Sequence, residues 1–252
     1  MAKVASGRLV VLSGPSCAGK SPLFRALERL HPDLVGGLQP LVLYTSREPR
    51  PGERDGVDYH FRDRVFIEGL RTEGDRHVVL DVRGDAQALD LWELEGTLRK
   101  GDVLFEGNPF VGEVLLEHPR LKGIPRLPMF LSPLSREEIL DLRERAGAGL
   151  PAVVADVMRR KLLRRTRRQK GELSLRDLET VEKRAGSAFA ELRLAWKFRH
   201  VIPNHDGEDS ENWDSFYWPL GDARRAVRAV AALLRGERSG DVERWEADLL
   251  PS

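Results

Sequence analysis

Gly14-Pro15-Ser16-Cys17-Ala18-Gly19-Lys20-Ser21 is the stretch that decides the fold. It fits G-x-x-x-x-G-K-[ST], the pattern of a phosphate-binding loop. Residues 9–12 before it are apolar and suit a buried parallel strand, and residues 22–30 after it carry leucines at helical spacing. A strand, a glycine-containing loop and a helix in this order predict an α/β fold, in which a parallel sheet of the P-loop NTPase type is flanked by helices.

The residue types of this loop suit a bound triphosphate. Glycines let the backbone N–H groups turn toward phosphate oxygens, and the helix adds positive potential at its first turn. We expect Lys20 to bridge the β- and γ-phosphates and the Ser21 hydroxyl to ligate Mg²⁺. The alternative is a plain glycine turn, which the strand and helix on either side disfavour. The predicted cofactors are therefore ATP and Mg²⁺, with ATP bound along Gly14, Pro15, Ser16, Cys17, Ala18, Gly19, Lys20 and Ser21.

The amino-acid composition limits which binding partners and which cellular compartment we expect. The chain has 252 residues, and the charges of its 41 basic and 40 acidic residues nearly cancel. The overall charge therefore gives no indication of a polyanionic partner. No stretch approaches the roughly 18 apolar residues of a membrane span, so no membrane is expected. The single cysteine, Cys17, excludes an internal disulfide and favours a cytoplasmic protein. A redox switch at Cys17 is the alternative to a tolerated small residue. The sequence names no oligomeric state.

The segment from residue 45 to residue 61, TSREPRPGERDGVDYHF, predicts a structured loop because it is rich in proline, glycine and charge. Arginine binds phosphate oxygens in a bidentate manner, and a tyrosine hydroxyl adds a neutral donor. Arg47, Arg50 and Tyr59 therefore suit the capture of a phosphate group. A solvated charged loop is the alternative interpretation of the same residues.

Together, the phosphate loop and this segment resemble the guanylate kinase family. The segment matches T-[ST]-R-x-x-R-x-G-E-x-x-G-x-D-Y-x-F, the family's element for binding a nucleoside monophosphate. The resemblance implies that Arg47, Arg50 and Tyr59 hold the acceptor phosphate and that Glu53 belongs to the same element. It also implies transfer of the ATP γ-phosphoryl group to a nucleoside monophosphate, with GMP as first choice.

Several positions depart from the family pattern at the acceptor base. Leu43 stands where the family has a serine, and Asn108 replaces an aspartate. Residues 79–88 contain no tyrosine and no hydroxyl, and Asp81 is the candidate for the base-reading glutamate. Because buried polar groups set the discrimination between such substrates, another small phosphomonoester, such as a sugar phosphate, is the alternative acceptor. A binding module without turnover is the third hypothesis.

Further candidate residues lie in the second half of the chain. Glu106 ends an apolar strand at residues 103–108 and by resemblance helps Ser21 to hold Mg²⁺. A capping box at Ser135 opens a helix to about residue 145, which leads in the family to a mobile lid. The resemblance implies that lid arginines stabilise the transferred phosphoryl group. Their candidates are Arg143, Arg145 and Arg184, for which a solvated side chain is the alternative.

An additional amphipathic helix is expected over residues 151–170. Eight of the twelve residues at 159–170 are basic, a run that suits nucleic acid, an anionic membrane or a polyanionic substrate under an extended lid. A solvated helical face paired with nearby acids is the other interpretation. No nucleic-acid-binding motif accompanies the run.

The remaining chain predicts a last strand at residues 196–202, after which Asn204 by resemblance lines the adenine pocket, and a closing helix at residues 221–234. Trp245 is either exposed or docked. We expect one guanylate-kinase-like domain, made of a core at about 8–35, 101–140 and 190–236, an acceptor-binding element at about 40–100, an extended lid at about 141–189 and a polar tail at 237–252.

Overall fold

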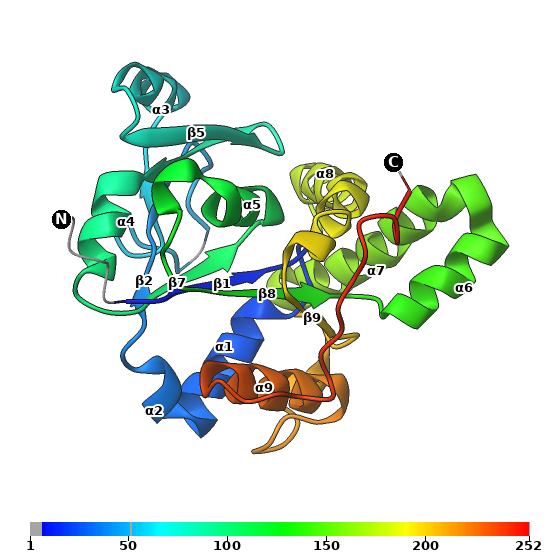
Figure 1. Cartoon of the computed structure of the whole chain (residues 1–252). Coiled ribbons are helices and arrows are strands. Elements are labelled where there is room, and N and C mark those ends of the chain that lie inside the picture. Colours follow the sequence, from blue (N-terminus) through cyan, green and yellow to red (C-terminus); the bar gives the residue numbers. More distant parts are fainter. Residues whose placement is uncertain (1–6, 51, 252) are drawn as a thin grey trace.

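The computed structural model describes residues 7–50 and 52–251. Its central sheet has five parallel strands in the order β2-β7-β1-β8-β9 (Figure 1). These strands are β1 (Leu9–Ser13), β2 (Gln39–Pro40), β7 (Val103–Gly107), β8 (Arg126–Ser132) and β9 (His200–Pro203). The predicted strand at residues 9–12 is confirmed as β1, the middle strand. The strand predicted at 196–202 begins later, because Trp196 lies in a 3₁₀ turn.

Helices cover both faces of this sheet because successive side chains of β1 point to opposite sides. Leu9 and Val11 pack in one cluster with α4 (Leu91–Leu98), α5 (Pro109–Glu117) and α8 (Leu175–Leu192). Val10 and Leu12 pack in the other with α1 (Lys20–Leu30) and α9 (Gly221–Leu234). Figure 1 shows α1 and α9 below the sheet and α4, α5 and α8 above it. This α/β architecture is the predicted one.

A second sheet, of order β4-β3-β6-β5, forms most of the predicted acceptor-binding element. Its strands are β3 (Leu43–Thr45), β4 (Tyr59–Phe61), β5 (His77–Val82) and β6 (Asp85–Asp90), and α3 (Arg64–Gly69) lies beside β3 and β6. Although β2 and β3 are close together in the chain, they enter different sheets. After β6, helix α4 begins at Leu91, where the Asp90 side chain accepts the N–H groups of Trp92 and Glu93.

Three helices form the predicted lid region. In α6 (Arg136–Ala146), Ser135 and Glu138 make the expected capping box. The predicted helix at 151–170 is confirmed as α7 (Leu150–Lys170). It packs along α8 through buried apolar residues, which are Val154, Met158, Leu162, Val181, Ala185 and Leu192. Figure 1 shows α6 and α7 projecting to one side of the sheet.

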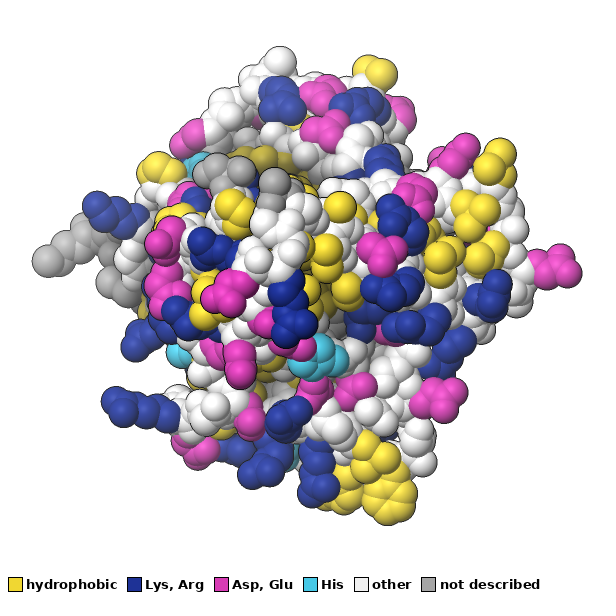
Figure 2. Space-filling view, turned by 90° about the vertical axis from the view of Figure 1, so that its right-hand side faces the viewer, with side chains coloured by type: hydrophobic (Ala, Val, Ile, Leu, Met, Phe, Trp, Pro, Cys, Tyr) yellow, Lys and Arg dark blue, Asp and Glu magenta, His cyan; other side chains and the backbone are white. Residues whose placement is uncertain are grey.

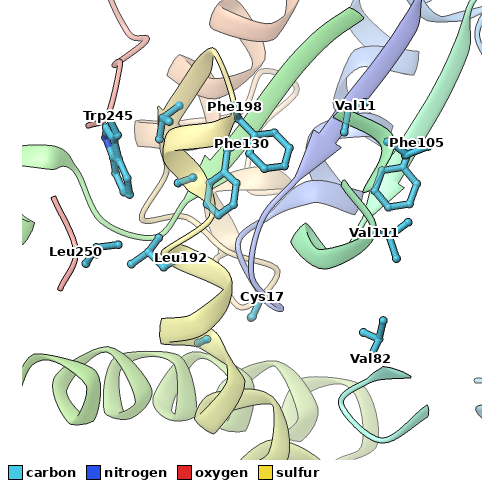
Figure 3. Packing of buried hydrophobic residues seen from close by; sticks show 14 of the residues in the cluster. Val11, Cys17, Val82, Phe105, Val111, Phe130, Leu192, Phe198, Trp245 and Leu250 are labelled. Atoms are coloured by element: carbon cyan, nitrogen blue, oxygen red, sulfur yellow. The ribbon is translucent and has the colours of Figure 1, made fainter. Parts of the chain in front are cut away.

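The C-terminal segment is docked on the core. Trp245 is only 3% exposed, and Leu249 and Leu250 are also buried. Figure 3 shows Trp245 and Leu250 on the same side of the apolar cluster as Leu192 of α8. Of the aromatic residues near position 215, Trp213 is buried, whereas Phe216, Tyr217 and Trp218 are exposed.

The shorter elements connect these parts. They are α2 (Pro32–Val35) and the 3₁₀ turns η1 (Leu70–Thr72), η2 (Pro119–Leu121), η3 (Gly147–Gly149), η4 (Ala195–Lys197) and η5 (Glu211–Trp213). Among the helices of the described part of the chain, none combines the length and the hydropathy that crossing a membrane requires.

Candidate functional site

The predicted phosphate loop joins β1 to α1, in the strand–loop–helix order expected from the motif. Gly19 has a φ of 98°, and a Cβ atom there would lie 2.6 Å from Nδ2 of Asn204, so both conformation and space require glycine. The Lys20 Nζ donates to the carbonyl oxygens of Gly14 and Pro15 at 2.8 Å each. Burial lowers the pKa of Lys20, while Glu208 and Glu106 oppose that shift. The predicted ATP-binding residues therefore form one compact loop around a buried ammonium group.

Ser21 and Glu106 meet beside this loop. The register between β1 and β7 sets Glu106 opposite Leu12, and the Ser21 Oγ donates to Oε1 of Glu106 at 2.8 Å. Burial raises the pKa of Glu106, although the Ser21 hydroxyl and Lys20 act against that rise. Oxygen donors of this kind suit Mg²⁺, which usually takes one or two protein ligands together with phosphate oxygens and water. In the described residues no cluster of three or more His, Cys, Asp or Glu side chains offers a fuller metal site.

Asn204 ties the end of β9 to the phosphate loop. Its Nδ2 donates to the carbonyl oxygens of Ala18 at 2.8 Å and Asp206 at 2.7 Å. Its Oδ1 is buried and has no hydrogen-bond partner within the described residues. The Trp213 indole N–H also donates to the Asp206 carbonyl. The structure thus brings Asn204 to the predicted donor site.

Cys17 is buried in this loop, between β1 and the α8 side of the core (Figure 3). Burial, followed by the charge of Glu208, raises the pKa of its thiol far above the usual range. A protonated, buried thiol is a poor nucleophile, which favours the packing interpretation of Cys17 over a redox switch.

Arg47, Glu53 and Tyr59 form one unit in the acceptor-binding element. Two guanidinium nitrogens of Arg47 donate to the Glu53 carboxylate at 2.8 and 3.0 Å, and the guanidinium lies 5.1 Å from the centre of the Tyr59 ring. The backbone N–H of Arg50 donates to the same carboxylate at 2.7 Å. Burial acts to raise the pKa of Glu53, but these hydrogen bonds hold it below its usual value. Glu53 therefore orients both arginines.

Five arginines converge between this element and the lid. They are Arg47, Arg50, Arg83, Arg165 and Arg184. Burial, and then the charges of the other four, lowers the pKa of Arg184 to about 9. Within the described residues, no carboxylate lies within salt-bridge distance of Arg184 or Arg165, and the Arg165 Nε is buried without a hydrogen-bond partner. This concentration of positive charge suits a polyanion.

Three predicted site residues lie elsewhere. The Arg143 guanidinium donates to the carbonyl oxygens of Asp248 and Leu249 in the C-terminal segment. Arg145 is 76% exposed and pairs with Asp141. The C-terminal segment holds Arg143 and Asp141 holds Arg145, so the structure does not bring either side chain to the arginine cluster. Asp81 is bound by Arg64 and by the Gly84 N–H at the exposed end of β5, which separates it from the cluster.

Sequence reasoning missed Arg165 and Glu191 as parts of the candidate site. The fully buried Glu191 carboxylate accepts hydrogen bonds from the Arg83 guanidinium, the Ser187 hydroxyl and the Asn108 Nδ2. A charged residue on the apolar face of α8 was the available signal for Glu191. Arg165 gave none, because it stands in the basic run at residues 159–170 and only the packing of α7 selects its direction.

Two departures from the family pattern have structural roles. Leu43 is buried in the core. The Asn108 Oδ1 accepts the N–H of Phe110 at 2.8 Å and caps α5, while its Nδ2 contacts Glu191. Neither residue is an isolated surface position.

The basic run on α7 is largely paired inside the molecule. Six of its eight basic side chains contact carboxylates or backbone carbonyls, and they are Arg159, Arg160, Lys161, Arg164, Arg168 and Lys170. Figure 2 views this side of the molecule and shows basic and acidic side chains interspersed rather than a patch of one sign. Nucleic-acid binding by residues 159–170 remains a prediction.

Comparisons with known proteins agree with the motifs. A family model described as guanylate kinase matches residues 6–82. The chain is 32% identical over 235 residues to a guanylate kinase of Corynebacterium jeikeium (strain K411), which covers 91% of this chain and 97% of that protein. It is 36% identical over 169 residues to one of Mycobacterium bovis, with 63% and 72% coverage. A crystal structure of guanylate kinase from Anaplasma phagocytophilum matches with a TM-score of 0.53 and 20% identity, over 94% of this chain and 90% of that chain, and supports the fold alone.

Proposed function

The chain belongs to the guanylate kinase family, and from this premise we propose that it transfers the γ-phosphoryl group of ATP to GMP, which yields ADP and GDP. The observation that carries the proposal is the meeting of two sites. The phosphate loop with Lys20, Ser21 and Glu106 faces an arginine cluster built from the acceptor-binding element and the lid.

The donor half of the proposal rests on the phosphate loop. Its backbone N–H groups and Lys20 would bind the phosphates of ATP, and Asn204 would line the adenine side. Ser21 and Glu106 would hold Mg²⁺, which neutralises charge on the β- and γ-phosphates when bound. Lys20 is already held by two carbonyl oxygens, so its ammonium is positioned before the donor arrives.

The acceptor half rests on Arg47, Arg50 and Tyr59, which would bind the phosphate of GMP. Glu53 positions the two arginines through its hydrogen bonds to the Arg47 guanidinium and the Arg50 backbone N–H. No protein nucleophile is needed, because the acceptor phosphate is an anion at neutral pH. Alignment and charge stabilisation therefore supply the catalysis.

We assign the transfer step to Lys20, Arg184 and Arg165. Arg165 takes the place of Arg143 and Arg145 in this proposal. It lies near Arg50 and Arg184, whereas Arg143 binds the C-terminal segment and Arg145 pairs with Asp141. Arginines at this point would stabilise charge on the transferred group. We also place the reaction in the cytoplasm, which the single cysteine favours.

A screen of acceptors tests the proposal. ADP release is followed with ATP, Mg²⁺ and a panel of nucleoside and sugar monophosphates. Turnover with GMP is the expected result. If only a non-nucleotide monophosphate is turned over, that compound would replace GMP as the proposed acceptor. If the protein neither turns over any acceptor nor binds ATP, the hypothesis of a binding module without catalysis would be favoured.

A further inference from the structure

The segment at residues 206–210, which follows Asn204, lies over the phosphate loop. The Glu208 Oε2 accepts the backbone N–H of Gly19 at 3.0 Å. That N–H belongs to the loop whose amides bind phosphate oxygens in proteins with this motif. A carboxylate oxygen is an anionic acceptor like a phosphate oxygen, so Glu208 takes a position that suits the donor's phosphate chain.

The charge of Glu208 acts on several groups of the donor site. It acts to raise the pKa of Lys20, of Glu106 and of the Cys17 thiol, which places its carboxylate close to all three. Glu208 therefore acts on the phosphate loop through its charge as well as through its hydrogen bond to the Gly19 N–H. A phosphate group entering this space would meet a negative charge that it must displace.

The neighbouring residue, Asp209, ties the segment to the lid helix α7. Its carboxylate is 4% exposed and pairs with Lys161 at 3.3 Å and Arg164 at 2.7 Å. Its carbonyl oxygen accepts from Arg168 at 2.8 Å, and Lys161 also donates to the His205 carbonyl at 2.6 Å. Ionic and backbone contacts thus hold the segment between α7 and the phosphate loop.

We propose that Glu208 is an intramolecular competitor for the phosphate site of the donor nucleotide, and that Asp209 couples its displacement to the position of α7. The inference rests on the proposed function, because it assumes that ATP binds at the phosphate loop. ATP must move Glu208 away from the Gly19 N–H. Because Asp209 joins the same segment to Lys161 and Arg164, that movement also acts on the lid.

Direct binding of MgATP tests the competition. E208Q removes the charge and E208A removes the acceptor as well. Because the contact between Glu208 and the Gly19 N–H involves a full charge, we expect E208Q to lower the dissociation constant of MgATP by about tenfold and E208A by at least as much. The matched control is E211Q, which removes the same charge at an exposed position three residues later. Thermal melting confirms that each variant is folded.

The coupling is tested in a double-mutant cycle. D209N should also lower the dissociation constant of MgATP, but it should have no further effect in the E208Q background, because it acts through Glu208. Equal effects of D209N in both backgrounds would overturn the coupling. Unchanged or weaker MgATP binding by both E208Q and E208A would overturn the competition alone, provided that the wild-type protein binds MgATP. A wild-type protein that binds no MgATP would remove the proposed function and this inference with it.

Discussion

The proposed donor end and the proposed acceptor end of the site differ in how far the protein itself satisfies their polar groups. At the donor end, Lys20 donates to two carbonyls, Ser21 donates to Glu106 and the Gly19 N–H donates to Glu208. At the acceptor end, Arg165 and Arg184 stand among other arginines.

This difference concerns what a ligand must do at each end. If ATP binds as proposed, it would replace the contact between Glu208 and the Gly19 N–H, and part of its binding free energy would be spent on that displacement. An acceptor phosphate bound at the proposed site would enter a region where arginines repel one another and would relieve that repulsion. The free protein would therefore oppose binding of the donor and favour binding of the acceptor.

The largest expected effect is at the donor end. Lys20→Ala should lower kcat by about 10³-fold or more, because it removes a positive charge from the developing phosphate charge. ADP release with GMP measures the effect, and circular dichroism checks the fold. Activity within tenfold of wild type would contradict the role assigned to Lys20.

The next effect separates the two sets of lid arginines. Arg184→Ala and Arg165→Ala should each lower kcat by about 10²-fold, since they remove charge that faces the transferred group. Arg143→Ala should change kcat by less than about threefold, because its guanidinium binds the C-terminal segment. Arg167→Ala, at an exposed position of α7, is the matched control. A larger loss for Arg143 than for Arg165 would reverse the assignment.

A third prediction concerns the support of the acceptor end. Glu191→Gln should reduce the free energy of unfolding by about 2–3 kcal/mol, because it leaves Arg83 without its buried anionic partner. Urea unfolding measures the change. The matched control is Glu182→Gln, at an exposed position of α8, the helix that also carries Glu191. This change removes the partner of Arg159 on α7 and should cost less than about 1 kcal/mol. Equal costs would show that burial of Glu191 contributes nothing.

The smallest effect is a pH dependence beside the donor site. Burial acts to lower the pKa of His205, but Asp222 and Glu138 raise it above its usual value. A raised histidine pKa contributes stability that is fully present below the unfolded pKa of about 6.5 and is lost as the pH rises through the folded pKa. His205 is about half exposed, so His205→Gln should cost less than about 1 kcal/mol at pH 5.5 and less still at pH 9. A cost that is greater at pH 9 would contradict this sign.

Local patterns predicted the elements whose cause is local. The phosphate loop, the capping box at Ser135 and the helix at 151–170 each depend on residues within one or two turns, and all three are confirmed. The hairpin of β5 and β6 was missed for an equally local reason. Its two-residue turn, Arg83-Gly84, has positive φ at both positions, and arginine is not the usual residue at the first.

The sequence by itself determined the family and the strand–loop–helix unit of the phosphate loop, and it predicted that Arg47 and Arg50 belong to one element. Each of these follows from a short motif whose backbone geometry depends on adjacent residues. Only the tertiary structure decided which later arginines reach the site and which acids surround them. Arg165, Glu191 and Glu208 lie far from the phosphate loop in the chain. Their positions depend on the rotation of α7 and α8 and on the path after β9, which are set by packing between distant segments.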